Sequence, residues 1–249
     1  MKKLLNILFL LIAVGLYAQN EAAFQKGNQL YNEGKYLEAI EQYQSIIDSG
    51  MHSAELYYNI ANANYKLNKI APTVYYYEKA LQLAPDDADI QSNLAFAQNM
   101  TIDAIDELPE AGFSRILNNW IGKLNYNSWA RVAVLFSFVF VLTFITYYFG
   151  TRANQKRYFF ILSFIALTMM ILSTVFAFRQ KTMDTNDQPA IVFAVETQAK
   201  TDPNFTSEQV FVLHEGTKVQ VLQAFGDWKK IQIANGTEGW IPAEDIKEL

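Results

Sequence analysis

Two long apolar runs dominate the pattern of hydrophobic and polar positions along the chain. Residues 132–151 and 158–178 hold 20 and 21 residues, respectively, without a charged side chain. A helix of about 20 apolar residues crosses the hydrocarbon core of a bilayer. We therefore predict transmembrane helices at 129–150 and 158–179, joined by a loop at 151–157. The alternative, two buried core helices of a soluble domain, would require protein to cover both runs.

The short loop between the runs predicts which way they cross the membrane. It contains Arg152, Lys156 and Arg157, and short loops rich in Lys and Arg stay on the cytoplasmic side. Both runs lack Asp, Glu, Lys, Arg and His, whereas ion and proton paths keep ionisable residues inside their spans. The hairpin is therefore predicted to anchor the chain rather than to conduct ions.

The N-terminal residues have the composition of a secretory signal peptide. Lys2 and Lys3 precede an apolar stretch that ends at the small residue Ala18. We predict a signal peptide at 1–18; because Leu16 is large for a cleavage site, an uncleaved anchor helix is the alternative. Together with the basic loop, either interpretation predicts that the N-terminal and C-terminal domains lie in the periplasm. With the signal peptide cleaved, the chain is a two-pass protein of the inner (cytoplasmic) membrane.

Charge divides the chain into three blocks. Residues 21–110 carry 14 acids and 5 bases, residues 111–181 carry 8 bases and no acid, and residues 182–249 carry 11 acids and 5 bases. This division indicates several domains rather than one. Nucleic-acid binding depends on Lys and Arg at the phosphates, so the two acidic blocks argue against a nucleic-acid partner.

The first acidic block contains an internal repeat with a period of 34 residues. A helix–turn–helix repeat of this length resembles the tetratricopeptide repeat. Gly34 and Asn68 stand where each first helix would end, a position that favours a left-handed residue. We predict an all-α tetratricopeptide segment at 21–100, with two repeats and a third first helix. The matched pairs include Asn28 and Asn62, Tyr31 and Tyr65, and Tyr43 and Tyr77.

The repeat predicts one groove for a partner protein. On the tetratricopeptide pattern, aromatic and amide side chains of the first helices face inward, where they suit the backbone of an extended peptide. The alternative is that this face packs on the protein's own next segment. The predicted partner-binding residues are Phe24, Asn28, Tyr31, Tyr58, Asn62, Tyr65 and Lys66.

A linker at 101–127 joins the repeats to the first apolar run. Its apolar residues Ile116, Trp120 and Leu124 recur with helical spacing, and Lys123 lies among them. Such a pattern is typical of an amphipathic helix in the membrane interface. Packing beneath the repeats is the alternative.

The C-terminal segment changes to strand patterning. Val, Ile, Thr and aromatic residues alternate with polar ones, and Asn235 with Gly236 forms a hairpin-turn pair. The stretches "FVLHEGTKVQVL", "GDWKKIQI" and "GWIPAEDI" resemble a bacterial SH3 domain. We predict a linker at 180–188 and a small all-β SH3-like barrel at 189–249. The predicted ligand face consists of Phe205, Trp228 and Trp240, with a place in the core as the alternative for both tryptophans.

No constellation in the sequence predicts catalysis or a metal site. Cysteine is absent, and His52 and His214 are the two histidines, so thiol chemistry and Cys-based metal sites are excluded. No serine lies in a nucleophile elbow, and the chain has neither a phosphate-binding loop nor a dinucleotide fingerprint. We therefore expect no enzymatic activity, no metal and no cofactor.

The domain order resembles the BatE-like proteins of the Bacteroides aerotolerance group. A signal peptide, tetratricopeptide repeats, two transmembrane helices and a C-terminal bacterial SH3 domain occur together in that family. The resemblance implies a membrane-anchored scaffold in an aerotolerance or envelope-stress complex, with von Willebrand A-domain membrane proteins as partners. The alternative function is a peptidoglycan-binding or envelope-sensing module that acts through the SH3-like domain. In either case we expect a multi-domain chain.

Overall fold

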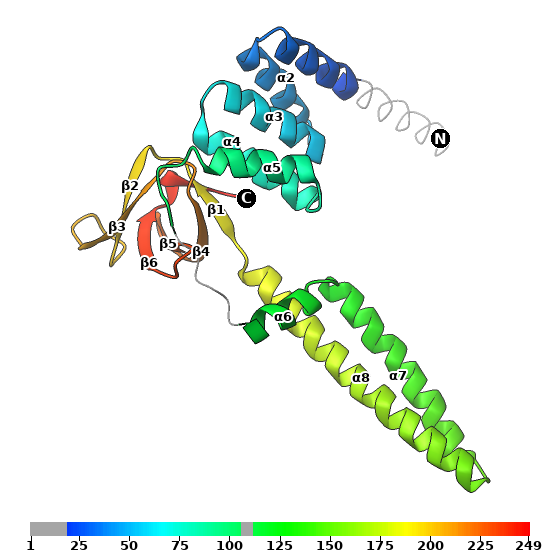
Figure 1. Ribbon diagram of the computed structural model, residues 1–249. Helices are drawn as coiled ribbons and strands as arrows, with labels where there is room; N and C mark the ends of the chain where they lie inside the picture. Colours follow the sequence, from blue (N-terminus) through cyan, green and yellow to red (C-terminus); the bar gives the residue numbers. More distant parts are fainter. Residues whose placement is uncertain (1–18, 106–111) are drawn as a thin grey trace, which may run out of the picture. The chain divides into compact units, whose positions relative to one another are not determined.

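The computed structural model describes residues 19–105 and 112–249 (Figure 1). The signal peptide predicted at 1–18 lies outside the described residues. The chain divides into two compact units, Met1–Glu107 with Gln188–Leu249, and Leu108–Asp187. The first unit contains a helical segment and a β-sheet, and the second contains helices.

The helical segment is a stack of helices connected by short turns (Figure 1). Residues 19–32 form a helix, followed by α2 (Tyr36–Asp48), α3 (Ala54–Lys66), α4 (Ile70–Leu83) and α5 (Ala88–Gln98). The turns that precede α2 and α4 contain Gly34, with φ 77°, and Asn68, with φ 55°. Both lie in the left-handed region, which Gly and Asn tolerate best. Side chains of Ser53 and Asp87 accept backbone N–H groups at the starts of α3 and α5.

The 34-residue period recurs in the side-chain contacts of the stack. Tyr43 donates its hydroxyl to Asn28 Oδ1 at 2.7 Å, and Tyr77 donates its hydroxyl to Asn62 Oδ1 at 2.5 Å. Two successive helical hairpins are therefore built alike. Corresponding ring contacts join Phe24 to Tyr43 at 5.8 Å and Tyr58 to Tyr77 at 5.9 Å between centroids.

Two apolar clusters hold the helices together. One joins the helix at 19–32 to α2 and α3, and the other joins α3, α4 and α5. Gly27 lies so close to the Tyr43 ring that a Cβ at this position would overlap it, which explains a glycine inside a helix. The fully buried aliphatic residues of the stack are Ala39, Ile60, Ala61, Ala63, Val74 and Ala80.

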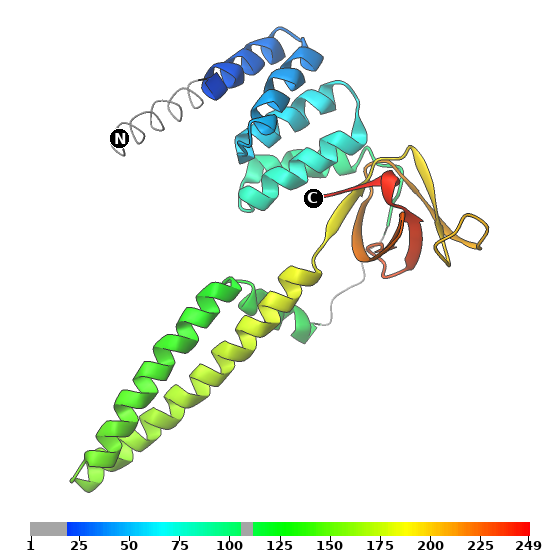
Figure 2. The same ribbon diagram turned by 180° about the vertical axis from the view of Figure 1, so that it is seen from behind.

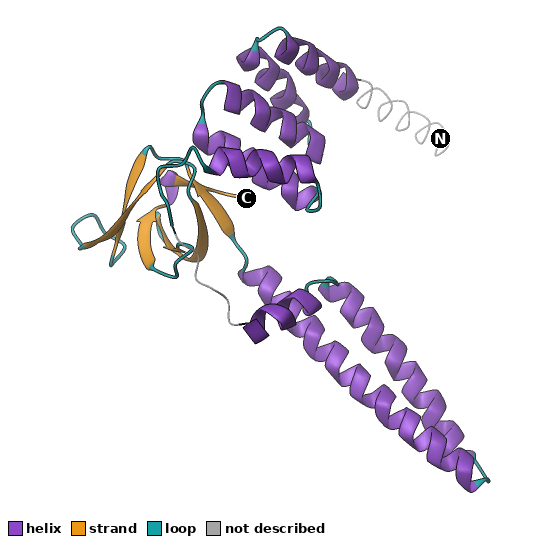
Figure 3. Ribbon diagram, in the orientation of Figure 1, coloured by secondary structure: helices purple, strands orange, loops and turns teal. Residues whose placement is uncertain are grey.

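The strands lie in the C-terminal segment and form one strongly curved sheet (Figure 3). All strand pairs are antiparallel, in the order β3-β2-β6-β5-β4-β1-β7. Gly236 has φ 84° in the turn between β5 and β6, as the Asn-Gly pair predicts. The strands are β1 (Pro189–Val192), β2 (Glu196–Lys200), β3 (Gln209–His214), β4 (Lys218–Phe225), β5 (Trp228–Gln232), β6 (Glu238–Pro242) and β7 (Ile246–Glu248).

Aliphatic residues, rather than tryptophans, form the core of the sheet. Val192, Ile231 and Ile241 are completely buried, whereas Trp228 and Trp240 are half-buried. Successive side chains of a strand point to opposite faces, so the burial of Ile241 directs its neighbour Trp240 away from the core. Neither tryptophan is a member of the buried core cluster, and their role as ligand contacts stays a prediction.

The sheet packs on the helical segment within the first unit. Ile191 of β1 is completely buried in the cluster of α3, α4 and α5, and the Phe193 ring meets Tyr75 edge-on at 5.7 Å. Lys218 pairs with Glu78 at 2.7 Å. An isolated fragment of residues 189–249 would expose Ile191 and Phe193 to water, so the sheet depends on the helices for part of its packing.

Asp103 links the segment after α5 to the sheet. Its carboxylate accepts the backbone N–H of His214 at 2.7 Å and the Thr217 hydroxyl at 2.6 Å, and it pairs with His214 Nδ1 at 2.7 Å. The Asp103 side chain is 10% exposed. Burial alone would raise the pKa of Asp103, but the hydrogen bonds from Thr217 and His214 outweigh it and hold the pKa below its ordinary value. Two residues further on, Ile105 packs against the sheet core.

The second unit contains α6 (Gly112–Ile121), α7 (Tyr126–Phe149) and α8 (Ala153–Asn186). By length and composition α7 and α8 can cross a membrane, and only 6% and 17% of their most apolar windows are buried. Figure 2 shows them side by side, as the green and yellow-green helices. Buried Ser163, Ala166 and Ser173 permit the close packing. Helix α8 occupies most of the segments expected as a loop at 151–157 and as a linker at 180–188.

We predict that Asp103→Ala weakens the contact between helices and sheet. The substitution leaves buried donors of His214 and Thr217 without their acceptor, which costs about 1–3 kcal/mol. Hydrogen exchange should speed up at residues 209–220 of the full chain in detergent. Glu41→Ala, on an exposed position of α2, is the control and should change stability by less than about 0.5 kcal/mol.

The same contact should weaken in acid. The folded pKa of Asp103 is lowered, so its stabilising effect is complete above the unfolded pKa of about 3.9 and is lost as the pH falls through the folded pKa. The difference in melting temperature between wild type and Asp103→Ala should therefore shrink at low pH. A difference that is constant with pH, or equal effects of Asp103→Ala and Glu41→Ala, would contradict this account.

Candidate functional site

A pocket on the helical segment brings together four of the seven predicted groove residues. Tyr31, Asn62, Tyr65 and Lys66 line it, and its volume is about 220 Å³. We call it the helical pocket. It takes side chains from the helix at 19–32, from α3, from α4 and from α5, so all the stacked hairpins contribute. Its remaining lining residues are Tyr77, Asn93 and Phe96.

Hydrogen bonds fix the polar groups of the helical pocket. Asn62 Oδ1 accepts the Tyr77 hydroxyl, and Asn93 Nδ2 donates to the Tyr58 hydroxyl at 2.8 Å. Burial, reinforced by neighbouring tyrosines, raises the pKa of Tyr77, so its phenol stays protonated as a donor. Because Oδ1 of Asn62 is engaged, its Nδ2 group is left to donate to a ligand.

The pocket carries positive charge. Lys66 is exposed at its edge, and no acid is among the described residues that line it. Tyr65 is 38% exposed and Phe96 is 61% exposed, which gives the pocket aromatic walls. Aromatic side chains supply rigid contact area, and an ammonium group attracts carboxylates. The arrangement fits a peptide with an acidic group or a carboxylate end.

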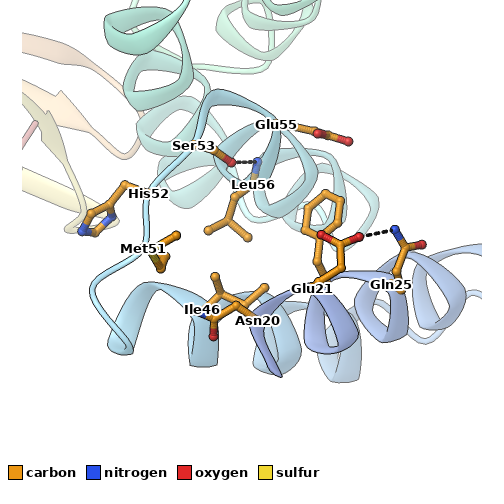
Figure 4. Close-up of a pocket in the computed structure, with 10 residues that line it drawn as sticks. Asn20, Glu21, Gln25, Ile46, Met51, His52, Ser53, Glu55 and Leu56 are labelled. Atoms are coloured by element: carbon orange, nitrogen blue, oxygen red, sulfur yellow. Dashed lines mark hydrogen bonds between the residues drawn. The ribbon is translucent and has the colours of Figure 1, made fainter. Parts of the chain in front are cut away.

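The other three predicted groove residues lie elsewhere. Asn28 accepts from both Tyr43 and Asn59, at 2.7 and 3.1 Å, so it connects helices. Phe24 lines a second pocket of about 300 Å³, which we call the end pocket (Figure 4). Tyr58 lines a third, with Asp87 and Asp89. The predicted groove is therefore divided into separate pockets.

Figure 4 shows how the end pocket is built. Ile46, Met51 and Leu56 form its apolar floor. Glu21 accepts from Gln25 at 3.0 Å on one side, and Ser53 caps α3 by accepting the N–H of Leu56 at 3.1 Å on the other. No local pattern predicts this pocket, because its floor joins Ile46 of α2, Met51 of the following turn and Leu56 of α3.

The sheet carries a further pocket of about 320 Å³, the sheet pocket. Phe205 meets Trp228 edge-on with 4.8 Å between ring centroids, and Phe205 is 76% exposed. Trp240 packs against Phe225, with 6.4 Å between ring centroids, and does not line the pocket. It nevertheless lies on the same face of the sheet as Trp228, because its register partner Lys230 is two residues from Trp228. The other lining residues are Glu196, Thr197, Gln198, Lys200, Pro242 and Asp245.

Acidic groups give the sheet pocket its own chemistry. Asp245 accepts the Thr197 hydroxyl at 2.6 Å, which fixes the carboxylate beside Trp228, and Glu196 is exposed at the rim. An aromatic wall next to a proline and carboxylates suits an extended or Pro-rich segment with a basic residue. No local pattern predicts Glu196 and Asp245 as pocket residues, because only the folded sheet brings β2 and the 3-10 turn after β6 together.

Both histidines make structural contacts. His52 Nδ1 lies 2.6 Å from the Tyr57 hydroxyl, and His214 pairs with Asp103. Across residues 19–105 and 112–249, no group of three or more His, Cys, Asp or Glu residues is placed to hold a metal ion. The described part of the chain thus offers pockets for ligands and no assembled metal centre.

Comparison with known proteins identifies the C-terminal segment. A stretch of 76 residues is 33% identical to Protein O-mannosyl-transferase TMTC1 of Homo sapiens, which is 30% of this chain and 9% of that protein. The chain thus spans about a tenth of that relative's length, too little to transfer its activity. Residues 200–247 match the family model described as Bacterial SH3 domain. They cover β3 to β6 and five of the eight residues that line the sheet pocket, so the C-terminal part of this chain carries a bacterial SH3 domain.

Proposed function

We propose that this chain is a non-enzymatic, membrane-anchored scaffold that presents two binding modules in the periplasm. The helical segment acts as a short tetratricopeptide module, and the bacterial SH3 domain acts as the second module. The process served is an aerotolerance or envelope-stress complex, as the resemblance to BatE-like proteins implies. Von Willebrand A-domain membrane proteins are the proposed partners.

The helical pocket is the observation that carries this proposal. Its aromatic walls, its oriented Asn62 amide and its single cation, Lys66, match what an extended acidic peptide needs. The 34-residue recurrence of the Asn–Tyr pairs supports the tetratricopeptide assignment. Cysteine is absent from the sequence and both histidines are engaged in structural contacts, which supports a binding role over catalysis.

Two features support the membrane anchor and its orientation. Few residues in the most apolar windows of α7 and α8 are buried, 6% and 17%, which leaves apolar surface for lipid to cover. Lys156 and Arg157 lie in the first turn of α8, beside the turn that joins it to α7, and basic residues at such a position favour the cytoplasm. The N-terminal and C-terminal segments would then both be periplasmic.

We predict that Tyr65→Ala with Lys66→Ala removes partner binding. Aromatic and charged anchors each contribute more than about 1 kcal/mol to an interface, so partner recovery from solubilised membranes should fall at least about tenfold. Asn62 is a poor choice for this test, because Asn62→Ala would leave the buried Tyr77 hydroxyl without its acceptor. Lys69→Ala with Gln82→Ala, both exposed outside the pocket, is the matched control. Equal recovery with both double variants would rule out the helical pocket as the binding site.

The orientation predicts a labelling pattern in a chain without natural cysteines. Gln82→Cys, on α4, should react with a membrane-impermeant maleimide in spheroplasts. Asn154→Cys, at the start of α8, should react only after the membrane is permeabilised. Both positions are exposed in the structure, so burial does not decide the outcome. Labelling of Asn154→Cys in intact spheroplasts would place the loop between α7 and α8 outside the cytoplasm and would contradict the proposed topology.

The sheet pocket favours a second function, recognition of peptidoglycan or its peptides by the SH3 domain. If the pocket binds the wall, Phe205→Ala should reduce co-sedimentation of the full chain with purified sacculi. Leu222→Ala is the control, because Leu222 of β4 is also exposed, at 44%, and does not line the pocket. Unchanged co-sedimentation with sacculi after Phe205→Ala would mean that the sheet pocket does not bind the wall. The helical segment would then be the proposed binding module that remains.

A further inference from the structure

Helix α6 is tied to both long helices of the second unit. The Trp129 indole N–H of α7 donates to the backbone oxygen of Ile121 at 2.9 Å. Arg179 of α8 donates from Nη2 to Asn118 Oδ1 at 3.0 Å. Ile121 is completely buried. Helix α6 is therefore held against the α7–α8 hairpin by one hydrogen bond to each of the two long helices.

These ties place α6 at one end of the apolar runs. Trp129 packs edge-on against Phe176 at 5.1 Å, and Tyr147 packs against Phe160 at 5.6 Å at the opposite end of the pair. Aromatic residues at the ends of transmembrane helices mark the level of the head groups. In the proposed membrane anchor, α6 consequently lies at the interface rather than in the hydrocarbon core or in bulk water.

The exposed face of α6 and the turn after it is apolar. Ile116 is 59% exposed, Trp120 is 65% exposed and Leu124 is 38% exposed. Ile116 and Trp120 are four residues apart, which aligns them along one side of α6, and Leu124 follows in the turn after the helix. A helix with such a face buries it at the boundary between head groups and acyl chains.

Basic side chains surround this apolar face. Lys123 lies over the Trp120 ring, 4.9 Å from its centroid, and Arg179 uses one of its N–H donors on Asn118. Arg131 and Lys181 are exposed in α7 and α8 close to the same end. We call Lys123, Arg131, Arg179 and Lys181 the basic collar. Residues 111–181 contain no acid, and Asp184, one turn beyond Lys181 on α8, accepts a hydrogen bond from Gln180 at 2.8 Å.

We infer that the basic collar binds the phosphate head groups of anionic phospholipids while α6 lies in the interface. Arg forms paired hydrogen bonds with phosphate oxygens, and Lys adds a point charge. The proposed topology puts the α6 end of the hairpin on the periplasmic side, where transmembrane proteins do not accumulate Lys and Arg. The four residues of the basic collar, half of the eight basic residues of 111–181, nevertheless lie here, and phosphate binding accounts for them. The inference rests on the proposed membrane anchor.

The test uses the full chain in nanodiscs of phosphatidylglycerol or of phosphatidylcholine. Hydrogen exchange of residues 112–125 should be slower in phosphatidylglycerol, by roughly fivefold for each cation that engages a phosphate. Lys123→Gln with Arg179→Gln should abolish the difference between the two lipids. Lys156→Gln with Arg157→Gln removes the same charge from the other end of the hairpin and should leave the difference intact.

Two further measurements separate the possible causes. Asn118→Ala removes the hydrogen bond to Arg179 but keeps every cation, so the difference in hydrogen exchange between the two lipids should remain. If this variant lost the difference, the hydrogen bond rather than the cations would be responsible, and the inference would be overturned. Equal hydrogen exchange of the wild-type protein in the two lipids would also overturn the inference. So would a lipid difference that disappears when soluble glycerol phosphate is added. Co-sedimentation of the same proteins with membranes tests the membrane anchor separately. A protein that sediments equally with both lipids has its anchor but lacks the head-group site.

Discussion

The buried carboxylate of Asp103 is the interaction on which the first unit depends. A carboxylate removed from water needs several hydrogen bonds to offset its lost hydration, and His214 and Thr217 supply them from the sheet. The partners lie 111 and 114 positions from Asp103 along the chain. The contact therefore fixes where the segment after α5 crosses the sheet, and with it the place of Ile105 in the sheet core.

Close backbone approach accompanies this contact. Gly216 has φ 87°, and a Cβ there would overlap side-chain atoms of Ile70 and Thr101. A larger residue at position 216 would push the β3–β4 turn away from α4 and pull His214 from Asp103. Ile191 is buried among helical residues on the same side. Helices and sheet thus share packing, so the two binding modules of the proposed scaffold are parts of one folded unit.

Local periodicity explains how much the sequence predicted. The 34-residue period, the two long apolar runs and the Asn235–Gly236 turn each depend on neighbouring residues, and each was visible before the structure. The position of Trp240 was not, because its direction depends on which residues of β6 face the core. The Asp103–His214 pair was not, because no local pattern links residues 111 positions apart. For the same reason, the sequence does not show that Asn28 accepts from Tyr43 and Asn59 instead of lining the helical pocket. Partner binding by the predicted groove residues stays a prediction.

The insertion of the second unit into the first has a consequence for biosynthesis. The helical segment leaves the ribosome before α7 and α8, and its partner strands begin only at Pro189. Synthesis of the 80 residues of Leu108–Asp187 takes about 4–16 s at about 5–20 residues per second. During that interval Tyr75 and the α4 surface that receives Ile191 have no sheet to cover them. The nascent chain thus has a period of vulnerability to aggregation or proteolysis that ends only when its last 60 or so residues are delivered to the same compartment.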